Sequence, residues 1–191
     1  MAHTQFAALL LATAAGVEFL GLAWLASGLR RRGHSLATLG LWRSASLLDY
    51  AIGCAIAFAY CAFTWRQPSV AALAFQFSAL KAIALAAAVV AGIFEEVFFR
   101  GFLMNLLKWR GLGATVQVIV SGLTFGQAHA AWGLGHPSAQ AFLQPAIWTS
   151  ILGAGLAVLY LKSGRALGPV ILSHMLIDAV IEPGLVLSFF G

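Results

Sequence analysis

The chain has 191 residues, of which 61% are hydrophobic and only 9% are charged. Soluble domains carry about 25% charged residues, so this composition excludes a soluble domain and indicates a membrane protein. The formal net charge is +5, but the basic residues sit in short loops between apolar runs, where they set membrane orientation. We therefore expect an integral membrane protein of a bacterial inner membrane, with the lipid bilayer as a partner and no nucleic-acid partner.

Apolar runs long enough to cross a bilayer recur along the whole chain. They predict an all-α fold, a polytopic transmembrane helix bundle of about six spans, at residues 6–29, 47–65, 82–107, 114–131, 146–161 and 167–189. The apolar stretch 70–107 is too long for one span, so residues 70–80 are interpreted as an interfacial lead-in. The alternative is two short spans there, which would give seven. Residues 35–46 are expected to form an interfacial segment or loop, and residues 132–144 a loop.

The basic residues favour one orientation of these six spans. The loops after spans one, three and five hold most of them, namely Arg30, Arg31, Arg32, Arg43, Lys108, Arg110, Lys162 and Arg165. The positive-inside rule then places these loops in the cytoplasm and both chain termini on the other side.

Ionisable side chains inside spans are informative because each costs about 2.5–3.5 kcal/mol at the centre of a membrane helix. Glu96 and Arg100 are four residues apart, so they share a helix face and can pair. Glu95 is rotated away from that pair and is the less neutralised carboxylate. Taken alone, this group is also what an ion network that pins helices together would show.

Two further spans carry pairs with the same spacing of four residues. Phe125 and His129 share one face of the fourth predicted span, and His174 and Asp178 share one face of the sixth. A carboxylate one turn from an imidazole can fix the imidazole tautomer, although such a pair can equally serve packing. Counted by helical rise, these residues and Glu95 fall within the hydrocarbon zone, so three helices can present one polar cluster.

Such a cluster contains what water-mediated peptide hydrolysis needs. A carboxylate and an imidazole can deprotonate a water, and further donors can stabilise the tetrahedral oxyanion. The chain has no Gly-x-Ser-x-Gly nucleophile elbow and no His-Glu-x-x-His metal helix. No cofactor is expected. The alternative is a catalytic metal held by Glu95, His129 and His174.

Three segments in order resemble the motifs of a known family: EEVFFR (95–100), FGQAH (125–129) and HMLID (174–178). They look like the motifs of the CAAX-protease and bacteriocin-processing (CPBP) family of glutamate-type intramembrane proteases, which is related to the Ras-converting CAAX endopeptidase. The resemblance covers about residues 82–186. It implies a membrane-anchored peptide or protein as substrate: a prenylated tail, a bacteriocin-related peptide or the anchor of a surface protein. On this basis we divide the chain into residues 1–68, two N-terminal transmembrane helices with a basic cytoplasmic loop, and residues 69–191, a catalytic CPBP-like core.

The resemblance also implies a role for each matching residue. Glu95 would act with His129 to activate the water, and His174 with Asp178 would stabilise the oxyanion. The supporting residues would be Glu96, Arg100 and Phe125. Position 178 is Asp where the eukaryotic enzymes have Asn. An ionised Asp cannot donate to an oxyanion, so Asp178 must be protonated or must orient His174 instead.

Two other functions compete with the protease. The first is a non-catalytic membrane protein, such as a bacteriocin-immunity or scaffold protein, that keeps the cluster for packing. The second is a transporter with Glu95 and His129 as a proton relay, which the lack of an internal inverted repeat disfavours. The remaining acids match no motif: Glu18, expected to face the bundle interior, Asp49, and Glu182, which precedes Pro183 and is expected near a helix end.

Overall fold

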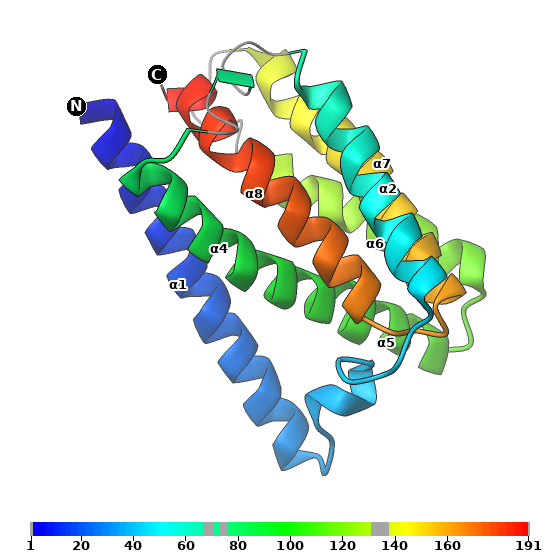
Figure 1. The fold of residues 1–191 in the computed structure, drawn as a ribbon. Coiled ribbons are helices and arrows are strands. Elements are labelled where there is room, and N and C mark those ends of the chain that lie inside the picture. Colours follow the sequence, from blue (N-terminus) through cyan, green and yellow to red (C-terminus); the bar gives the residue numbers. More distant parts are fainter. Residues whose placement is uncertain (1, 67–70, 73–75, 131–137, 191) are drawn as a thin grey trace.

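The computed structural model shows a bundle of helices (Figure 1). It describes residues 2–66, 71–72, 76–130 and 138–190. In chain order its elements are α1 (Ala2–Arg31), the 3-10 helix η1 (Leu36–Leu39), α2 (Leu47–Thr64), α4 (Ala79–Glu96), the π-helix η2 (Val97–Leu103), α5 (Met104–Trp109), α6 (Ala114–His129), α7 (Ala139–Lys162) and α8 (Gly168–Phe190). The described residues contain no strand, and the predicted all-α bundle is confirmed.

Four helical stretches in the described part of the chain are long and apolar enough to cross a membrane: Thr4–Arg31, Leu47–Thr64, Ala79–Trp109 and Phe142–Lys162. The helix α6 is shorter, with 16 residues. Residues 79–109 form one uninterrupted helical run through α4, η2 and α5. The alternative of two short spans is therefore wrong for this stretch.

The helix α7 begins well before its predicted start at residue 146. It starts at Ala139 and contains Pro145, so the predicted loop 132–144 is wrong for residues 139–144. Proline lacks the N–H of a regular helix, but membrane helices tolerate it where other groups satisfy the backbone. Here the hydroxyl of Thr149 donates to the carbonyl of Pro145 at 2.6 Å. Residues 131–137, which include the rest of that loop, lie outside the described residues.

The segment 35–46 folds against the bundle before α2 begins. After η1, Gly40 adopts a left-handed φ of 102°, and its carbonyl accepts from the N–H of Leu167 at 3.1 Å. A Cβ at this position would lie 2.1 Å from the carbonyl oxygen of Arg165, so only glycine fits. Ser46 and Asp49 then form a capping box that starts α2.

The packing of the helices determines which motifs meet. The helix α8 packs against both α2 and α4, while α6 packs along α7 and α1 covers α4. The larger apolar core includes Val97, Leu156 and Tyr160, and a smaller one joins Leu11 of α1 to Ala84 of α4. Packing of α4 against α8 places the first and third motifs side by side.

The two ends of the bundle differ in charge. The start of α1 and the end of α8 lie at the same end, which we call the terminal end (Figure 1). At the opposite end α1, α5 and α7 finish and α2, α6 and α8 begin. This second end carries the eight basic residues that the topology prediction collects on one side, so we call it the basic end.

Candidate active site

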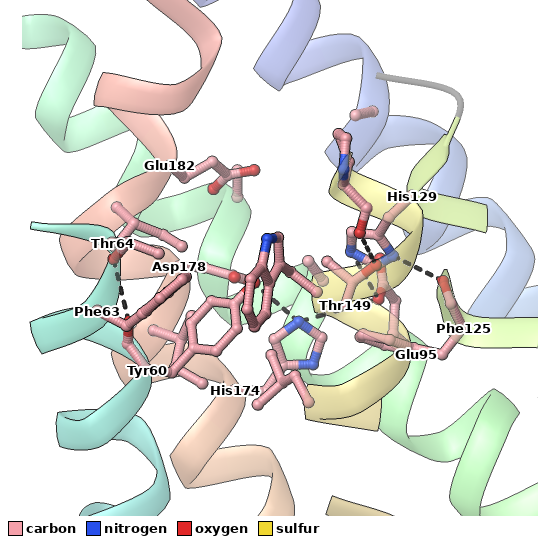
Figure 2. Close-up of a pocket in the computed structure, with 18 of the residues that line it drawn as sticks. Tyr60, Phe63, Thr64, Glu95, Phe125, His129, Thr149, His174, Asp178 and Glu182 are labelled. Atoms are coloured by element: carbon pink, nitrogen blue, oxygen red, sulfur yellow. Dashed lines mark hydrogen bonds and ion pairs between the residues drawn. The ribbon is translucent and has the colours of Figure 1, made fainter. Parts of the chain in front are cut away.

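Side chains from all three motifs line one pocket of about 390 Å³ (Figure 2). Glu95 enters it from α4, Phe125 and His129 from α6, and His174 and Asp178 from α8. The structure therefore brings together all five of these residues. Glu96 and Arg100, the other two residues singled out from the sequence, lie behind the pocket wall and are fully buried.

The Glu95 carboxylate faces both histidines. Its Oε2 atom is 3.8 Å from Nε2 of His129 and 3.9 Å from Nε2 of His174. That oxygen is buried and has no hydrogen-bond partner among the described residues. A buried oxygen at these distances from two imidazole nitrogens is an acceptor available for a further polar group.

One hydrogen bond fixes the tautomer of His129. Its Nδ1 atom lies 2.9 Å from the backbone carbonyl of Phe125. Because a carbonyl can only accept, Nδ1 carries the hydrogen, and Nε2 of the neutral ring presents a lone pair toward Glu95. The ring of Phe125 packs at 4.5 Å from the His129 ring and 5.5 Å from the His174 ring, measured between centroids. Phe125 thus spaces the two imidazoles.

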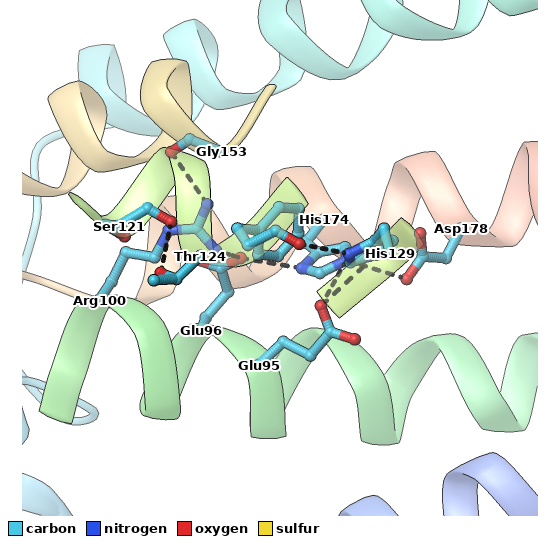
Figure 3. A network of polar contacts seen from close by, with 10 residues as sticks. Glu95, Glu96, Arg100, Ser121, Thr124, His129, Gly153, His174 and Asp178 are labelled. Atoms are coloured by element: carbon cyan, nitrogen blue, oxygen red, sulfur yellow. Dashed lines mark hydrogen bonds and ion pairs between the residues drawn. The ribbon is translucent and has the colours of Figure 1, made fainter. Parts of the chain in front are cut away.

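His174 is held between two carboxylates. Its Nδ1 atom is 2.8 Å from Oε1 of Glu96, and its Nε2 atom is 3.2 Å from Oδ2 of Asp178 (Figure 3). The spacing of four residues predicts the contact with Asp178. The contact with Glu96 joins α4 to α8 and is not evident from the sequence.

The ion pair between Glu96 and Arg100 is present. Arg100 Nη1 donates to Glu96 Oε1 at 2.7 Å, and its Nη2 donates to the carbonyl of Gly153 in α7 at 3.0 Å. The guanidinium carbon also lies 4.4 Å from the ring centroid of Phe125, within range of a cation–π interaction. Arg100 therefore ties the first motif to α6 and α7 while it neutralises Glu96.

A π-helical segment begins directly after the two glutamates. The wider turns of η2 run from Val97 to Leu103 and contain Arg100. Segments of this kind are rare and occur mostly at functional sites. No residue pattern in VFFRGFL distinguishes it from an ordinary α-helix, so the sequence did not predict it.

Two glycines let the helices that carry the motifs approach closely. A Cβ on Gly92 of α4 would lie 2.5 Å from Cγ of Met175 in α8, next to His174. A Cβ on Gly126 of α6 would lie 2.3 Å from the carbonyl oxygen of Ala146 in α7. Small residues at such contacts are typical of membrane helix packing. The approach at Gly92 is what allows Glu96 to reach His174.

Two acidic residues without a motif also line the pocket. Glu18 reaches it from α1 and Glu182 from α8, and the expectation that Glu18 faces the interior is met. The expected helix end near Glu182 is wrong, because α8 continues to Phe190. The signal for both was an acidic residue inside an apolar run. Asp49 lies at the basic end instead, where it pairs with Lys162 at 2.7 Å.

The arrangement of ligating side chains bears on the alternative of a catalytic metal. In the part of the chain that the structure describes, no group of three His, Cys, Asp or Glu side chains has an arrangement that could hold a metal ion. Glu95, His129 and His174 nevertheless surround one point of the pocket.

Comparison with known proteins gives the family. The family model described as "Type II CAAX prenyl endopeptidase Rce1-like" matches residues 76–180, which is more than half of the chain. The chain belongs to this family. The match contains all three motifs and confirms the resemblance drawn from them. No curated protein and no solved structure was found to match. Membership of the Rce1-like family, together with the apolar helical bundle, makes the chain an integral membrane protein of the CAAX-endopeptidase type.

Proposed function

We propose that the chain is a glutamate-type intramembrane endopeptidase in which Glu95 and His129 activate a water that hydrolyses a peptide bond. One observation carries the proposal: Oε2 of Glu95 lies 3.8 Å from His129 Nε2 and 3.9 Å from His174 Nε2 inside one pocket. The family supplies the reaction class. The geometry places three groups around one point: Glu95 as the base, His129 as a second proton acceptor and His174 as a hydrogen-bond donor.

The water in this proposal bridges Glu95 and His129. A separation of 3.8 Å is too long for a direct hydrogen bond and suits a bridging water. The water would donate one hydrogen to Glu95 and the other to the lone pair on His129 Nε2. As Glu95 takes its proton, the water oxygen bonds to the substrate carbonyl carbon and the carbonyl oxygen becomes an oxyanion. The proton then passes to the amide nitrogen as the C–N bond breaks, which leaves a carboxylic acid and an amine.

His174 is the proposed donor to the oxyanion. Glu96 accepts from Nδ1 at 2.8 Å, which holds the ring, and Asp178 lies 3.2 Å from Nε2. Carboxylates at both nitrogens favour an imidazole protonated at both, whose Nε2–H faces the pocket. This geometry supports the second of the two roles considered for Asp178: it orients His174 and keeps Nε2 protonated, so it need not donate by itself.

The proposed substrate is a peptide with a lipid-anchored or membrane-spanning segment. The pocket walls include the aromatic side chains of Tyr60, Phe63 and Trp148, which suit an apolar chain. The pocket is also lined by Thr64 at the end of α2 and Gln144 near the start of α7, so it extends toward the terminal end. With the basic end in the cytoplasm, the substrate reaches the pocket from the other side of the membrane.

Reconstitution in lipid vesicles tests the proposal. Because the family description names CAAX prenyl endopeptidases, one assay peptide ends in a farnesylated C-a-a-X sequence, and a second carries a saturated acyl chain in place of the prenyl group. Cleavage of either is followed by mass spectrometry. Replacing a general base lowers the rate by about 10²–10⁴-fold, and this loss is expected for Glu95→Gln and His129→Gln. The matched control is Glu182→Gln, which removes a carboxylate of α8 from the same pocket and is expected to keep most of the activity.

The outcome decides between catalysis and packing. If Glu95→Gln cleaves within about tenfold of the unaltered protein, Glu95 is not the base. Equal losses in Glu95→Gln and Glu182→Gln would mean that the carboxylates act through the shape or charge of the pocket. Circular dichroism and gel filtration of each variant show whether the bundle is intact.

A further inference from the structure

A second cavity lies at the basic end, away from the active-site pocket. It has a volume of about 200 Å³ and shares no residue with the first pocket. Its walls come from η1, from α5, from the end of α7 and from the turn before α8. Three of its side chains are basic: Arg43, Lys108 and Arg165. We call it the basic cavity.

No carboxylate balances these three charges. Of the six acidic residues in the chain, only Asp49 lies on the elements of this end, and it is already bonded to Lys162 and Ser46. Within the described residues, no ion pair involves any of the three cations. The basic cavity therefore holds a concentration of positive charge that the protein does not neutralise.

Neutral groups hold two of the cations in place. The guanidinium of Arg165 donates to Gln117 Oε1 at 2.5 Å and to Asn105 Oδ1 at 3.2 Å, and it lies 5.7 Å from the ring centroid of Tyr160. Arg43 donates to the carbonyl of Gly164 at 2.7 Å. These contacts order the side chains without cancelling their charge, which is the arrangement of a site prepared for an anion.

The backbone at Arg165 adds a second observation. Its φ of 67° is left-handed, and it is the one non-glycine residue with a positive φ in the described part of the chain. A bulky side chain in this region is uncommon because of steric strain. Such strain persists where the surroundings hold it and often accompanies a functional site. Here the strained turn carries the arginine that contacts both Asn105 and Gln117.

We propose that the basic cavity binds the phosphate group of an anionic phospholipid in the adjacent leaflet. The cavity lies where the helices end, which is the level of the lipid headgroups. Trp42 and Trp109, both exposed, stand at the same level, as tryptophans do at membrane interfaces. Guanidinium groups can hold two phosphate oxygens at once, and the lysine adds a further charge. The proposal does not depend on the protease mechanism.

Lipid binding to the purified protein in a neutral detergent tests this site. Phosphatidylglycerol and phosphatidylcholine are titrated separately and bound lipid is counted by native mass spectrometry, with thermal unfolding as a second readout. Each basic residue near an anionic surface strengthens binding about fivefold. The double variant Arg43→Gln/Lys108→Gln is therefore expected to bind phosphatidylglycerol about 25-fold more weakly. It keeps Arg165 and its hydrogen bonds but removes the bond from Arg43 to Gly164, so thermal unfolding without lipid is the check that the turn before α8 is still folded.

Two controls make the result decisive. Arg110→Gln/Arg31→Gln removes the same charge from the basic end outside the cavity and should leave the preference for phosphatidylglycerol unchanged. An equal loss in both double variants would overturn the site, because attraction would then depend only on total charge. Inorganic phosphate is added in a third arm. If it displaces phosphatidylglycerol at millimolar concentration, the site takes free phosphate and the assignment to lipid is overturned.

Discussion

The Nδ1 atom of His174 lies 2.8 Å from the Oε1 atom of Glu96, and the same oxygen accepts from Arg100 at 2.7 Å. One buried carboxylate oxygen therefore joins the first motif to the third. This relationship gives Glu96 two duties, because it neutralises Arg100 and also orients a proposed catalytic histidine. The two duties can be separated by mutation.

Single and double changes at Glu96 and Arg100 should affect stability and activity differently. Glu96→Leu or Arg100→Met alone leaves a buried charge without its partner, which costs about 3–5 kcal/mol. The double variant removes both charges and should regain much of that stability, measured by thermal unfolding in detergent. Its cleavage activity should stay lost, because His174 still lacks the partner of Nδ1. Recovered activity in the stable double variant would contradict a positioning role for Glu96.

The role of Asp178 can be resolved with two substitutions. In the unaltered protein the Asp178 carboxylate lies 3.2 Å from Nε2 of His174. An asparagine would keep a polar oxygen at this place, and its amide could also donate to an oxyanion. Asp178→Asn should therefore cleave within about tenfold of the unaltered protein, whereas Asp178→Ala should lose about 10–100-fold, as losses of orienting partners do. The check is kcat from peptide cleavage. A dead Asn variant beside an active Ala variant would reverse this assignment.

Close packing at Gly92 should be essential to the site. A Cβ there meets Cγ of Met175 at 2.5 Å, so Gly92→Ala must displace the Met175 side chain or push α4 away from α8, and overpacking of this kind costs about 1–3 kcal/mol. We expect a lower unfolding temperature and reduced cleavage. The matched control is Gly155→Ala in α7, where nothing lies within 4 Å of the added Cβ.

A second substitution strengthens the test at Gly92. Met175→Ala shortens the side chain that the new Cβ meets, so Gly92→Ala/Met175→Ala should recover part of the activity lost in Gly92→Ala. Failure to recover, with the bundle intact, would mean that Gly92 matters for a reason other than its distance from Met175.

The orientation of the bundle can be measured by labelling single cysteines. The native Cys54 and Cys61 are first replaced by alanine, and cysteine is then placed at Arg66 or at Arg110. Both changes remove one positive charge. With the basic end in the cytoplasm, a maleimide that does not cross membranes should label Arg66→Cys in intact cells and Arg110→Cys only after lysis. The reverse pattern would place the opening of the pocket on the cytoplasmic side.

Chelators test the alternative of a catalytic metal. If water is activated by Glu95 and His129 alone, cleavage should be unchanged after incubation with EDTA or 1,10-phenanthroline and after dialysis. Loss of activity that added zinc restores would favour the metal alternative, with Glu95, His129 and His174 as ligands. The substrate alone with each chelator serves as the control for effects on the assay.

The sequence predicted the parts of the site that depend on helical periodicity. Spacing of four residues anticipated the pairs Glu96–Arg100 and His174–Asp178, and charges in apolar runs marked the right spans. Contacts between helices could not be predicted from the sequence. The approach of Glu96 to His174 depends on how α4 packs against α8, which no local pattern encodes. For the same reason, Glu18 could not be placed in the pocket from α1.

The extent of α7 failed to follow from sequence for a different reason. Pro145 and the polar Gln144 are typical of a loop, yet the helix runs through both. The packing of the bundle overrides the local preference of these residues for a loop, because a helix inside a bundle can lose one backbone hydrogen bond without ending. The π-helical turn escaped prediction because it has no characteristic residue pattern.

That π-helical turn also has a geometric consequence for the helix that contains it. Residues 79–109 form one continuous rod that carries Glu95 and Glu96 before η2, and Asn105 and Lys108 after it. Each residue added to a helix rotates everything beyond it by about 100°. The π-helical turn therefore determines which way Asn105 and Lys108 face relative to Glu95 and Glu96. Deletion of a single residue between 97 and 103 would leave the glutamates aimed into their pocket and swing the far end of the rod by more than a quarter of a turn.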